Sequence, residues 1–207
     1  VAGPPPSGES AGLDLYEAAR TTRAVRRLRP DPVPDDVLRR VLRAATWAPS
    51  GGNLQPWHVI AVRDPARKQA LGELQRGPWA EYAAKRRALL SRLPESLRDP
   101  AERALRAGDH LAAHFGEAPV INVFCFHPDR LHVTDAGLGR LSVVGGASLY
   151  PAVQNLLLAC RAEGLGCVLT TLLCGQEKAV RTLLEIPEPW ATFAFVPIGW
   201  PVGGGHG

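Results

Sequence analysis

The chain contains no methionine, only three lysines, and no apolar run that approaches the length of a membrane span. A membrane-spanning helix needs about 20 consecutive apolar residues, so the sequence argues against a protein that crosses a bilayer. Because methionine is absent, we expect the natural polypeptide to begin before Val1. Residues 1–12 are rich in Pro, Gly and Ser and lack the apolar core of a signal peptide, which predicts a disordered lead-in.

Cysteine is scarce as well, with four residues and no Cys-x-x-Cys pair. Structural zinc sites are built from closely spaced cysteines, so the spacing argues against one. Each cysteine stands in an apolar stretch, where a reduced thiol behaves as a small buried side chain. The pattern predicts a protein of a reducing compartment, the cytoplasm. The four are Cys125, Cys160, Cys167 and Cys174.

Because lysine is nearly absent, arginine carries almost all of the positive charge, and the net charge is only +4. The arginines are scattered beside acids along amphipathic segments, and no basic strand interleaved with aromatic residues occurs. Nucleic-acid-binding domains concentrate positive charge on one face or in a recognisable motif. We therefore expect no nucleic-acid partner.

The 207 residues, 45% of them hydrophobic, are sufficient for one domain with a buried core. Apolar periodicity predicts helices at 13–21, 65–74, 147–162 and 176–184. Another helix is predicted to begin at Pro34, with an Asp as its N-cap. Strands are predicted at 57–62, 120–126, 167–173 and 192–198. The charged region 78–117 is expected to be helical, broken near Pro94 and Pro100, and to cover the substrate site, whereas 128–141 is expected to be a loop. The alternation predicts an α+β fold, a three-layer α-β-α sandwich over 13–202 with a flexible end at 203–207.

No set of side chains suited to acid–base or nucleophilic catalysis emerges. His110 and His114 stand at i and i+4, a spacing that can bind a metal, but no third ligand is suggested, which favours ordinary helical histidines. Gly164-Leu165-Gly166 lies between a helix and a strand, the wrong order for a dinucleotide fold. Ser50 lacks the Gly-x-Ser-x-Gly turn of hydrolases. Chemistry carried by a bound cofactor would explain this absence.

Three segments stand out. Pro49-Ser50-Gly51-Gly52-Asn53-Leu54-Gln55-Pro56-Trp57 joins a helix to a strand with more small and polar residues than a turn needs, although a rigid turn is the simpler interpretation. Arg23 and Arg26 could hold one phosphate between them, or belong to a solvated basic face. The third segment, 145–171, contains an apolar helix, a Gly stop and a β-branched run. That helix is apolar on all sides, which favours burial at a subunit interface.

In order and spacing these segments resemble the FMN-dependent nitroreductase family, from about Leu15 to Trp200. The Gln154-Asn155 helix and the closing Val196-Pro197-Ile198-Gly199-Trp200 strengthen the match. The resemblance implies an intertwined homodimer with two FMN sites at its interface. It also implies NADH or NADPH as electron donor and ping-pong hydride transfer to a small aromatic acceptor such as a nitro compound or a quinone.

Carried over residue by residue, the resemblance implies four sets of FMN contacts. The phosphate would lie at Arg23, Ala24 and Arg26, and the ring and ribityl chain at Pro49, Ser50, Gly51 and Asn53. The backbone of Leu169, Thr170 and Thr171 would run beside the ring, and Ser148 would be a polar contact from the partner subunit. Catalytic side chains are not implied, because FMN carries the chemistry.

Two departures from the family pattern leave alternatives open. Ala24 stands where the family usually has Ser, and no basic residue follows Gly199 where the family tends to have one. We expect the natural chain to continue beyond Gly207. A flavin-sequestering, redox-silent protein is one alternative function. Reductive dehalogenation or flavin destruction on the same fold is another, although neither substrate-lid signature is evident.

Overall fold

The computed structural model describes residues 13–204, so the expectations for 1–12 and 205–207 lie outside the described part of the chain. The helices are α1 (Leu15–Thr21), α2 (Asp35–Thr46), α3 (Pro65–Leu90), α4 (Glu95–His114), α5 (Tyr150–Ala162) and α6 (Glu177–Leu184), and the strands are β1 (Trp57–Val62), β2 (Val120–Phe126), β3 (Gly166–Cys167) and β4 (Ala191–Gly199). Within 13–204 no helix is long and apolar enough to cross a membrane.

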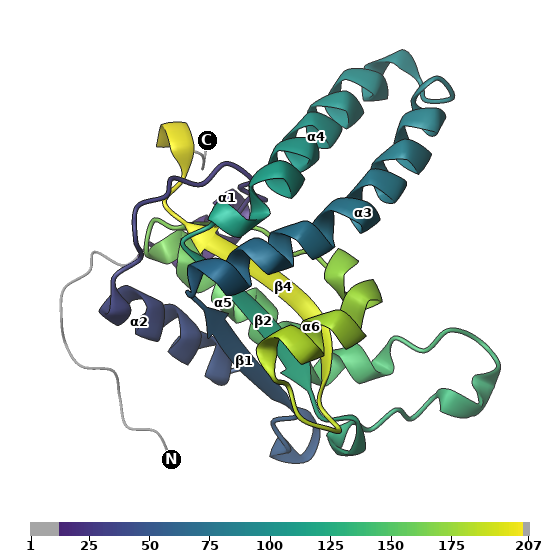
Figure 1. The fold of residues 1–207 in the computed structure, drawn as a ribbon. Coiled ribbons are helices and arrows are strands. Elements are labelled where there is room, and N and C mark those ends of the chain that lie inside the picture. The colour runs from purple at the N-terminus through teal and green to yellow at the C-terminus, as the bar shows by residue number, and fades with distance from the viewer. Residues whose placement is uncertain (1–12, 205–207) are drawn as a thin grey trace.

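The four strands form one antiparallel sheet in the order β1-β2-β4-β3 (Figure 1). At one end of the sheet Trp57 lies opposite Phe126, which in turn lies opposite Ala191. At the other end Cys167 lies opposite Ile198. The register therefore separates the start of β1 from β3 both along the strands and across the sheet.

Alternate residues of the central strands point into two separate hydrophobic cores, as the two-residue period of a strand requires. Phe124, Val196 and Ile198 pack with α2 and α5 on one face. Val123 and Phe195 pack with α3 and α6 on the other. Because helices cover both faces of the sheet, the predicted three-layer α-β-α architecture is confirmed.

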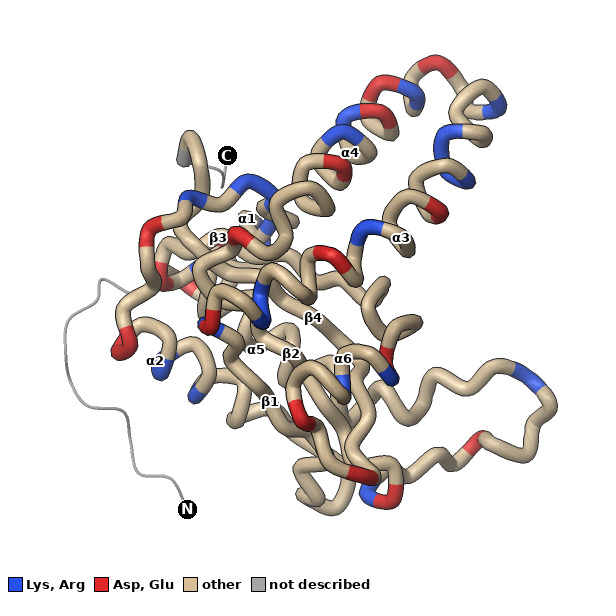
Figure 2. The backbone as a smooth tube through the Cα atoms, in the orientation of Figure 1, with Lys and Arg blue, Asp and Glu red and all other residues tan. Residues whose placement is uncertain are grey.

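The region after β1 differs most from its prediction. Instead of ending near residue 74, α3 continues through Pro78 to Leu90, and α4 runs through Pro100, so only the break at residues 91–94 is confirmed. A proline removes one helical hydrogen bond and crowds the preceding turn. Gly77 has no side chain to add to that crowding, and α3 packs against α4 beyond the proline. The two helices project from the body as a hairpin that carries charges of both signs (Figures 1 and 2).

Three smaller predictions are corrected. No Asp caps α2: Pro34 takes that position, and Asp35 and Asp36 lie in the first turn, where they pair with arginines. The strand predicted at 167–173 is only two residues long: beyond Cys167 the pairing with β4 is reduced to an isolated bridge between Thr170 and Phe195, and a 3₁₀ turn begins at Leu172. The helix predicted at 147–162 begins at Tyr150, and Gln154 and Tyr150 are exposed, so this single chain does not bury it on all sides.

Candidate functional site

The predicted site residues fall into two groups in the folded chain. Group one contains the arginine segment and the run after β3, and group two contains the loop before β1 and the turn before α5. The members of group one are Arg23, Ala24, Arg26, Leu169, Thr170 and Thr171, and the members of group two are Pro49, Ser50, Gly51, Asn53 and Ser148.

Group one is assembled by backbone pairing at the edge of the sheet. Ala24 forms a parallel bridge with Cys167, and the Val25 N–H donates to the Cys167 carbonyl at 2.9 Å. This close approach requires Gly166, because a Cβ there would lie 2.6 Å from Val25. Thr170 exchanges two 2.9 Å backbone hydrogen bonds with Phe195. The arginines are thereby held beside the run 168–172.

Neither guanidinium of the arginine pair is neutralised by a carboxylate within residues 13–204. Arg23 Nη1 donates to the backbone carbonyls of Arg20 and Thr22, and Arg26 Nη1 makes one long contact of 3.5 Å to the Ala24 carbonyl. Most arginines of the helices have acidic neighbours instead, as Arg40 has in Asp36 and Glu163. The pair is therefore free to bind an anion, and its planar forks suit a phosphate.

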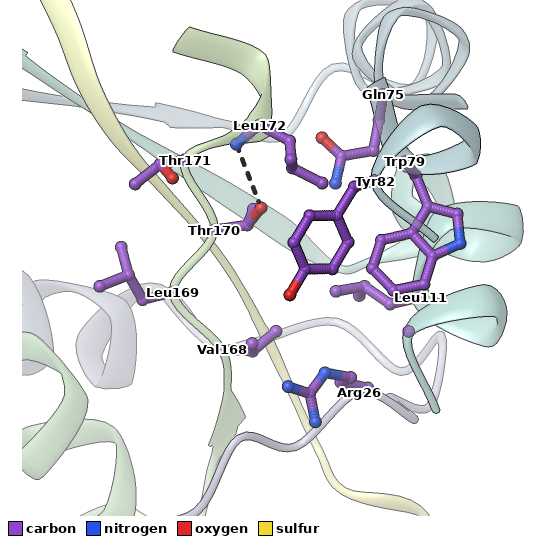
Figure 3. Close-up of a pocket in the computed structure, with 11 residues that line it drawn as sticks. Arg26, Gln75, Trp79, Tyr82, Leu111, Val168, Leu169, Thr170, Thr171 and Leu172 are labelled. Atoms are coloured by element: carbon purple, nitrogen blue, oxygen red, sulfur yellow. Dashed lines mark hydrogen bonds between the residues drawn. The ribbon is translucent and has the colours of Figure 1, made fainter. Parts of the chain in front are cut away.

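A cavity of about 360 Å³ opens beside group one, between the run 168–172 and helices α3 and α4. Arg26 lies at one end of it, and Gln75 lies at the other (Figure 3). Trp79 and Tyr82 extend from α3 into the same cavity. The walls are aromatic and apolar with few polar groups, the composition expected of a small-molecule site.

Trp79 is held rigidly. Its Nε1 donates to Asp109 Oδ1 at 2.9 Å, and Arg87 pairs with the same carboxylate. The Arg87 guanidinium holds the pKa of Asp109 below its usual value, with the Trp79 hydrogen bond acting in the same direction and partial burial opposing both. The indole lies directly on Gly108, where a Cβ would be 2.0 Å from the ring. The cavity wall formed by Trp79 is therefore fixed from two sides.

Group two is a strained and mostly exposed loop. Ser148 Oγ accepts from the Gly51 N–H at 3.0 Å, which ties the two parts of the group together. Ser50 Oγ accepts from the Gln55 N–H at 2.9 Å. Asn53 and Gln55 have positive φ values of 53° and 44°. Such conformations cost energy for residues other than glycine and concentrate at functional sites.

The two groups of one chain lie at opposite ends of α5. Ser148 just precedes that helix, whereas Cys167, which forms the backbone bridge with Ala24, follows it. Thirteen helical residues span about 20 Å. Group two also adjoins β1 and group one adjoins β3, the two outer strands, which are three strand spacings or about 14 Å apart. A single chain does not bring its two groups together.

The residues of group one fit a flat cofactor that carries a phosphate. The arginine pair supplies positive charge, and Leu169 to Thr171 supply a strip of backbone. Outside group one, in the adjoining cavity, the Gln75 Oε1 is buried without a hydrogen-bond partner in the described chain. Isolated buried polar atoms of this kind are uncommon in proteins and call for an explanation.

The histidine pair of α4 forms a different arrangement. The rings of His110 and His114 lie with centroids 4.3 Å apart, and His114 Nδ1 contacts Glu117 Oε2 at 3.0 Å. Burial, followed by Arg27 and His114, lowers the pKa of His110. Over residues 13–204 no group of three His, Cys, Asp or Glu side chains is placed to hold a metal.

Sequence reasoning predicted that region 78–117 covers the substrate site but did not single out the side chains of α3 that line the cavity. Gln75, Trp79 and Tyr82 recur at i, i+4 and i+7, a spacing that places them on one helix face. A glutamine in line with two aromatic residues on one helix face is the sequence pattern that could have indicated this wall. The prediction that the helix from residue 65 ends near residue 74 separated Gln75 from Trp79 and Tyr82.

The comparisons with known proteins are consistent with this geometry. The family model described as the nitroreductase family matches residues 19–200. An NADH dehydrogenase of Thermus thermophilus is 34% identical over 195 residues, which cover 94% of this chain and 90% of that protein. A 5,6-dimethylbenzimidazole synthase of Rhodospirillum rubrum is 34% identical, with 92% and 82% covered. An iodotyrosine deiodinase of Drosophila melanogaster is 29% identical, with 92% and 63% covered.

Solved structures show the same fold. A putative nitroreductase from Desulfovibrio desulfuricans, in complex with FMN, aligns with a TM-score of 0.66 at 23% identity, covering 94% of this chain and 90% of that one. A BluB-like flavoprotein from Clostridium difficile aligns with a TM-score of 0.68 at 18% identity, covering 93% and 92%.

Proposed function

The chain belongs to the nitroreductase family, and we propose that it is an FMN-dependent oxidoreductase that uses NADH or NADPH to reduce nitroaromatics, quinones or similar acceptors. The observation that carries the proposal is the cavity in which the unpaired Arg26, the run 168–172 and the aromatic side chains of α3 meet. FMN, when bound, would take a hydride from the donor and pass reducing equivalents to the acceptor, so both would use one slot in turn.

The residues of this chain would bind and orient the cofactor. Arg23 and Arg26 would hold the phosphate, with Ala24 leaving the hydroxyl contact of the family unfilled. Leu169, Thr170 and Thr171 would support the ring along their backbone, which is fixed by the hydrogen bonds to Phe195. The aromatic wall of α3 would exclude water from the opposite side.

The second part of the proposal is that each site is built by two copies of the chain. Group two lies too far from group one to join it within one chain, but a second copy could bring its Pro49, Ser50, Gly51, Asn53 and Ser148 against the first copy's arginines. Large apolar side chains flanking group two are exposed in the single chain, which supports their burial by a partner. They include Trp47 (57% exposed), Leu54 (40%) and Tyr150 (42%).

The experiment that tests the activity is steady-state oxidation of NADH and of NADPH by the purified, FMN-loaded protein with a nitroaromatic or a quinone as acceptor. Acceptor-dependent consumption of either donor is the expected result. A protein that binds FMN but consumes neither donor would be the redox-silent alternative. Release of halide from a halogenated aromatic in place of nitro or quinone reduction would indicate the dehalogenase alternative.

We further propose a cytoplasmic location. All four cysteines are free thiols, and Cys125, Cys160 and Cys167 are buried in the two cores. Free buried thiols suit a reducing compartment.

A further inference from the structure

One face of α3 lines the cavity with a polar residue followed by two aromatic ones. Gln75, Trp79 and Tyr82 are spaced at i, i+4 and i+7, so they lie in a row along the helix. Figure 3 shows Gln75 and Tyr82 directed toward the run that contains Thr170 and Leu172, with the Trp79 ring beside Tyr82 and Leu111. None of the three belongs to the arginine segment or to the loop before β1.

Gln75 is unusual because it is a buried polar residue whose amide oxygen has no hydrogen-bond partner in the described chain. Its side chain is 1% exposed, and its Oε1 has no hydrogen-bond partner within the part of the chain that the structure describes. The neighbouring groups in Figure 3 are the side chains of Leu172, Trp79 and Tyr82. A buried amide next to apolar groups destabilises the fold unless something binds it, so its presence points to a ligand.

The position of Gln75 separates it from the phosphate clamp. Arg26 lies at one end of the cavity and Gln75 at the other, with the aromatic side chains on the wall between them. Trp79 is fixed by Asp109 and by its contact with Gly108. The end of the cavity at Gln75 thus combines rigid aromatic walls with one buried amide oxygen that is free to accept a hydrogen bond.

From this geometry we propose that Gln75 is a specificity-determining residue of the acceptor slot. Its Oε1 accepts from an N–H or O–H substituent of the aromatic acceptor, while Trp79 and Tyr82 bound the plane of the aromatic ring. The inference rests on the proposed function and deepens it. It assigns the acceptor class as planar aromatics that carry a hydrogen-bond donor, such as an amide or hydroxyl group, because a ring without one leaves the buried Oε1 without a partner.

The test compares two ligands on the oxidised, FMN-loaded protein without electron donor, so that no turnover occurs. Perturbation of the flavin absorbance gives Kd for 4-nitrobenzamide and for methyl 4-nitrobenzoate, which keeps the nitro ring and the carbonyl and lacks the N–H donor. The variants are Gln75→Leu and, in case that shape is not accommodated, Gln75→Met. Gln69→Leu is the matched control, since Gln69 is an exposed glutamine of the same helix that contacts Glu73.

The parent and the control are expected to prefer 4-nitrobenzamide over methyl 4-nitrobenzoate. Both Gln75 variants should lose that preference by about 2- to 10-fold, the contribution of one neutral hydrogen bond. Their Kd for FMN should stay within about 2-fold of the parent. Their midpoint temperature of unfolding should be equal or higher, because replacing an unpaired buried amide with an apolar group removes a cost.

Three results would overturn the assignment. An unchanged ligand preference in both variants, with normal FMN binding, refutes the role of Gln75 while leaving the proposed function intact. A large loss of FMN affinity without a change of preference means that Gln75 contacts the cofactor instead. A parent protein that binds no FMN even in excess refutes the proposed function, and the acceptor slot with it.

Discussion

Replacing Arg26 with alanine isolates the contribution of the phosphate clamp. The guanidinium makes one hydrogen bond within the described chain, a long one of 3.5 Å to the Ala24 carbonyl, so its removal should leave the fold intact. A hydrogen bond to a charged group contributes about 1.5 to 3 kcal/mol, which corresponds to roughly 10- to 150-fold in affinity. Since Ala24 has no hydroxyl to compensate, FMN binding should weaken by a factor in this range.

The assay is titration of the apoprotein with FMN, followed by quenching of flavin fluorescence at low and high salt. Arg26→Lys, which keeps the charge and loses the planar fork, should bind with intermediate affinity. Arg39→Ala is the control, because Arg39 is an exposed arginine of α2 whose ion pair with Asp35 is long, at 3.8 Å. Parent-like affinity in the Arg23→Ala, Arg26→Ala double variant, with an unchanged salt dependence, would refute the clamp.

Two further predictions concern the wall of the cavity and the hydrophobic core. Gly108→Ala should destabilise the protein by about 1 to 3 kcal/mol, because its Cβ would overlap the Trp79 ring at 2.0 Å; denaturant unfolding at parent stability would mean that Trp79 does not lie on Gly108. Burial raises the pKa of Cys125 to about 12, so its thiol stays protonated from neutral pH to well above pH 9. Mass spectrometry after iodoacetamide treatment at pH 8 should show no modification of Cys125 in the folded protein and rapid modification after denaturation, whereas equal rates would contradict its burial.

Elements whose patterns are local were predictable from the sequence. The strands at 57–62 and 120–126 match their predicted bounds, because a mostly apolar run bounded by turn residues is a strong signal. The course of α3 was not predictable in this way. Pro78 is a local signal against helix, and packing against α4, the next helix of the chain, overrides it. The pairing of β3 likewise involves a segment distant in the sequence, since Ala24 bridges to Cys167.

Some of the residues of the candidate site could be predicted from the sequence. Arg23, Arg26 and Thr170 stand in recognisable segments, and the fold brings these segments together at one sheet edge. Their separation from Ser50 and Asn53 follows from strand order and from the length of α5, which no local pattern encodes. Their roles toward FMN stay predictions.

Mixing two defective variants tests most directly whether FMN binds at a site shared by two copies. One variant is Arg23→Ala, Arg26→Ala, which disables group one. The other is Ser50→Ala, Asn53→Gly, which disables group two while keeping a residue that tolerates the positive φ at position 53. Each alone should bind little FMN, as measured by the flavin absorbance that stays with the protein after gel filtration.

Random pairing after unfolding and refolding together makes about half of the dimers mixed, and each mixed dimer has one intact site of two. The mixture should therefore regain about a quarter of the FMN that the parent protein binds. If each chain formed a complete site by itself, every chain in the mixture would still contain one disabled group. FMN binding that stays at the level of the separate variants would contradict the shared site.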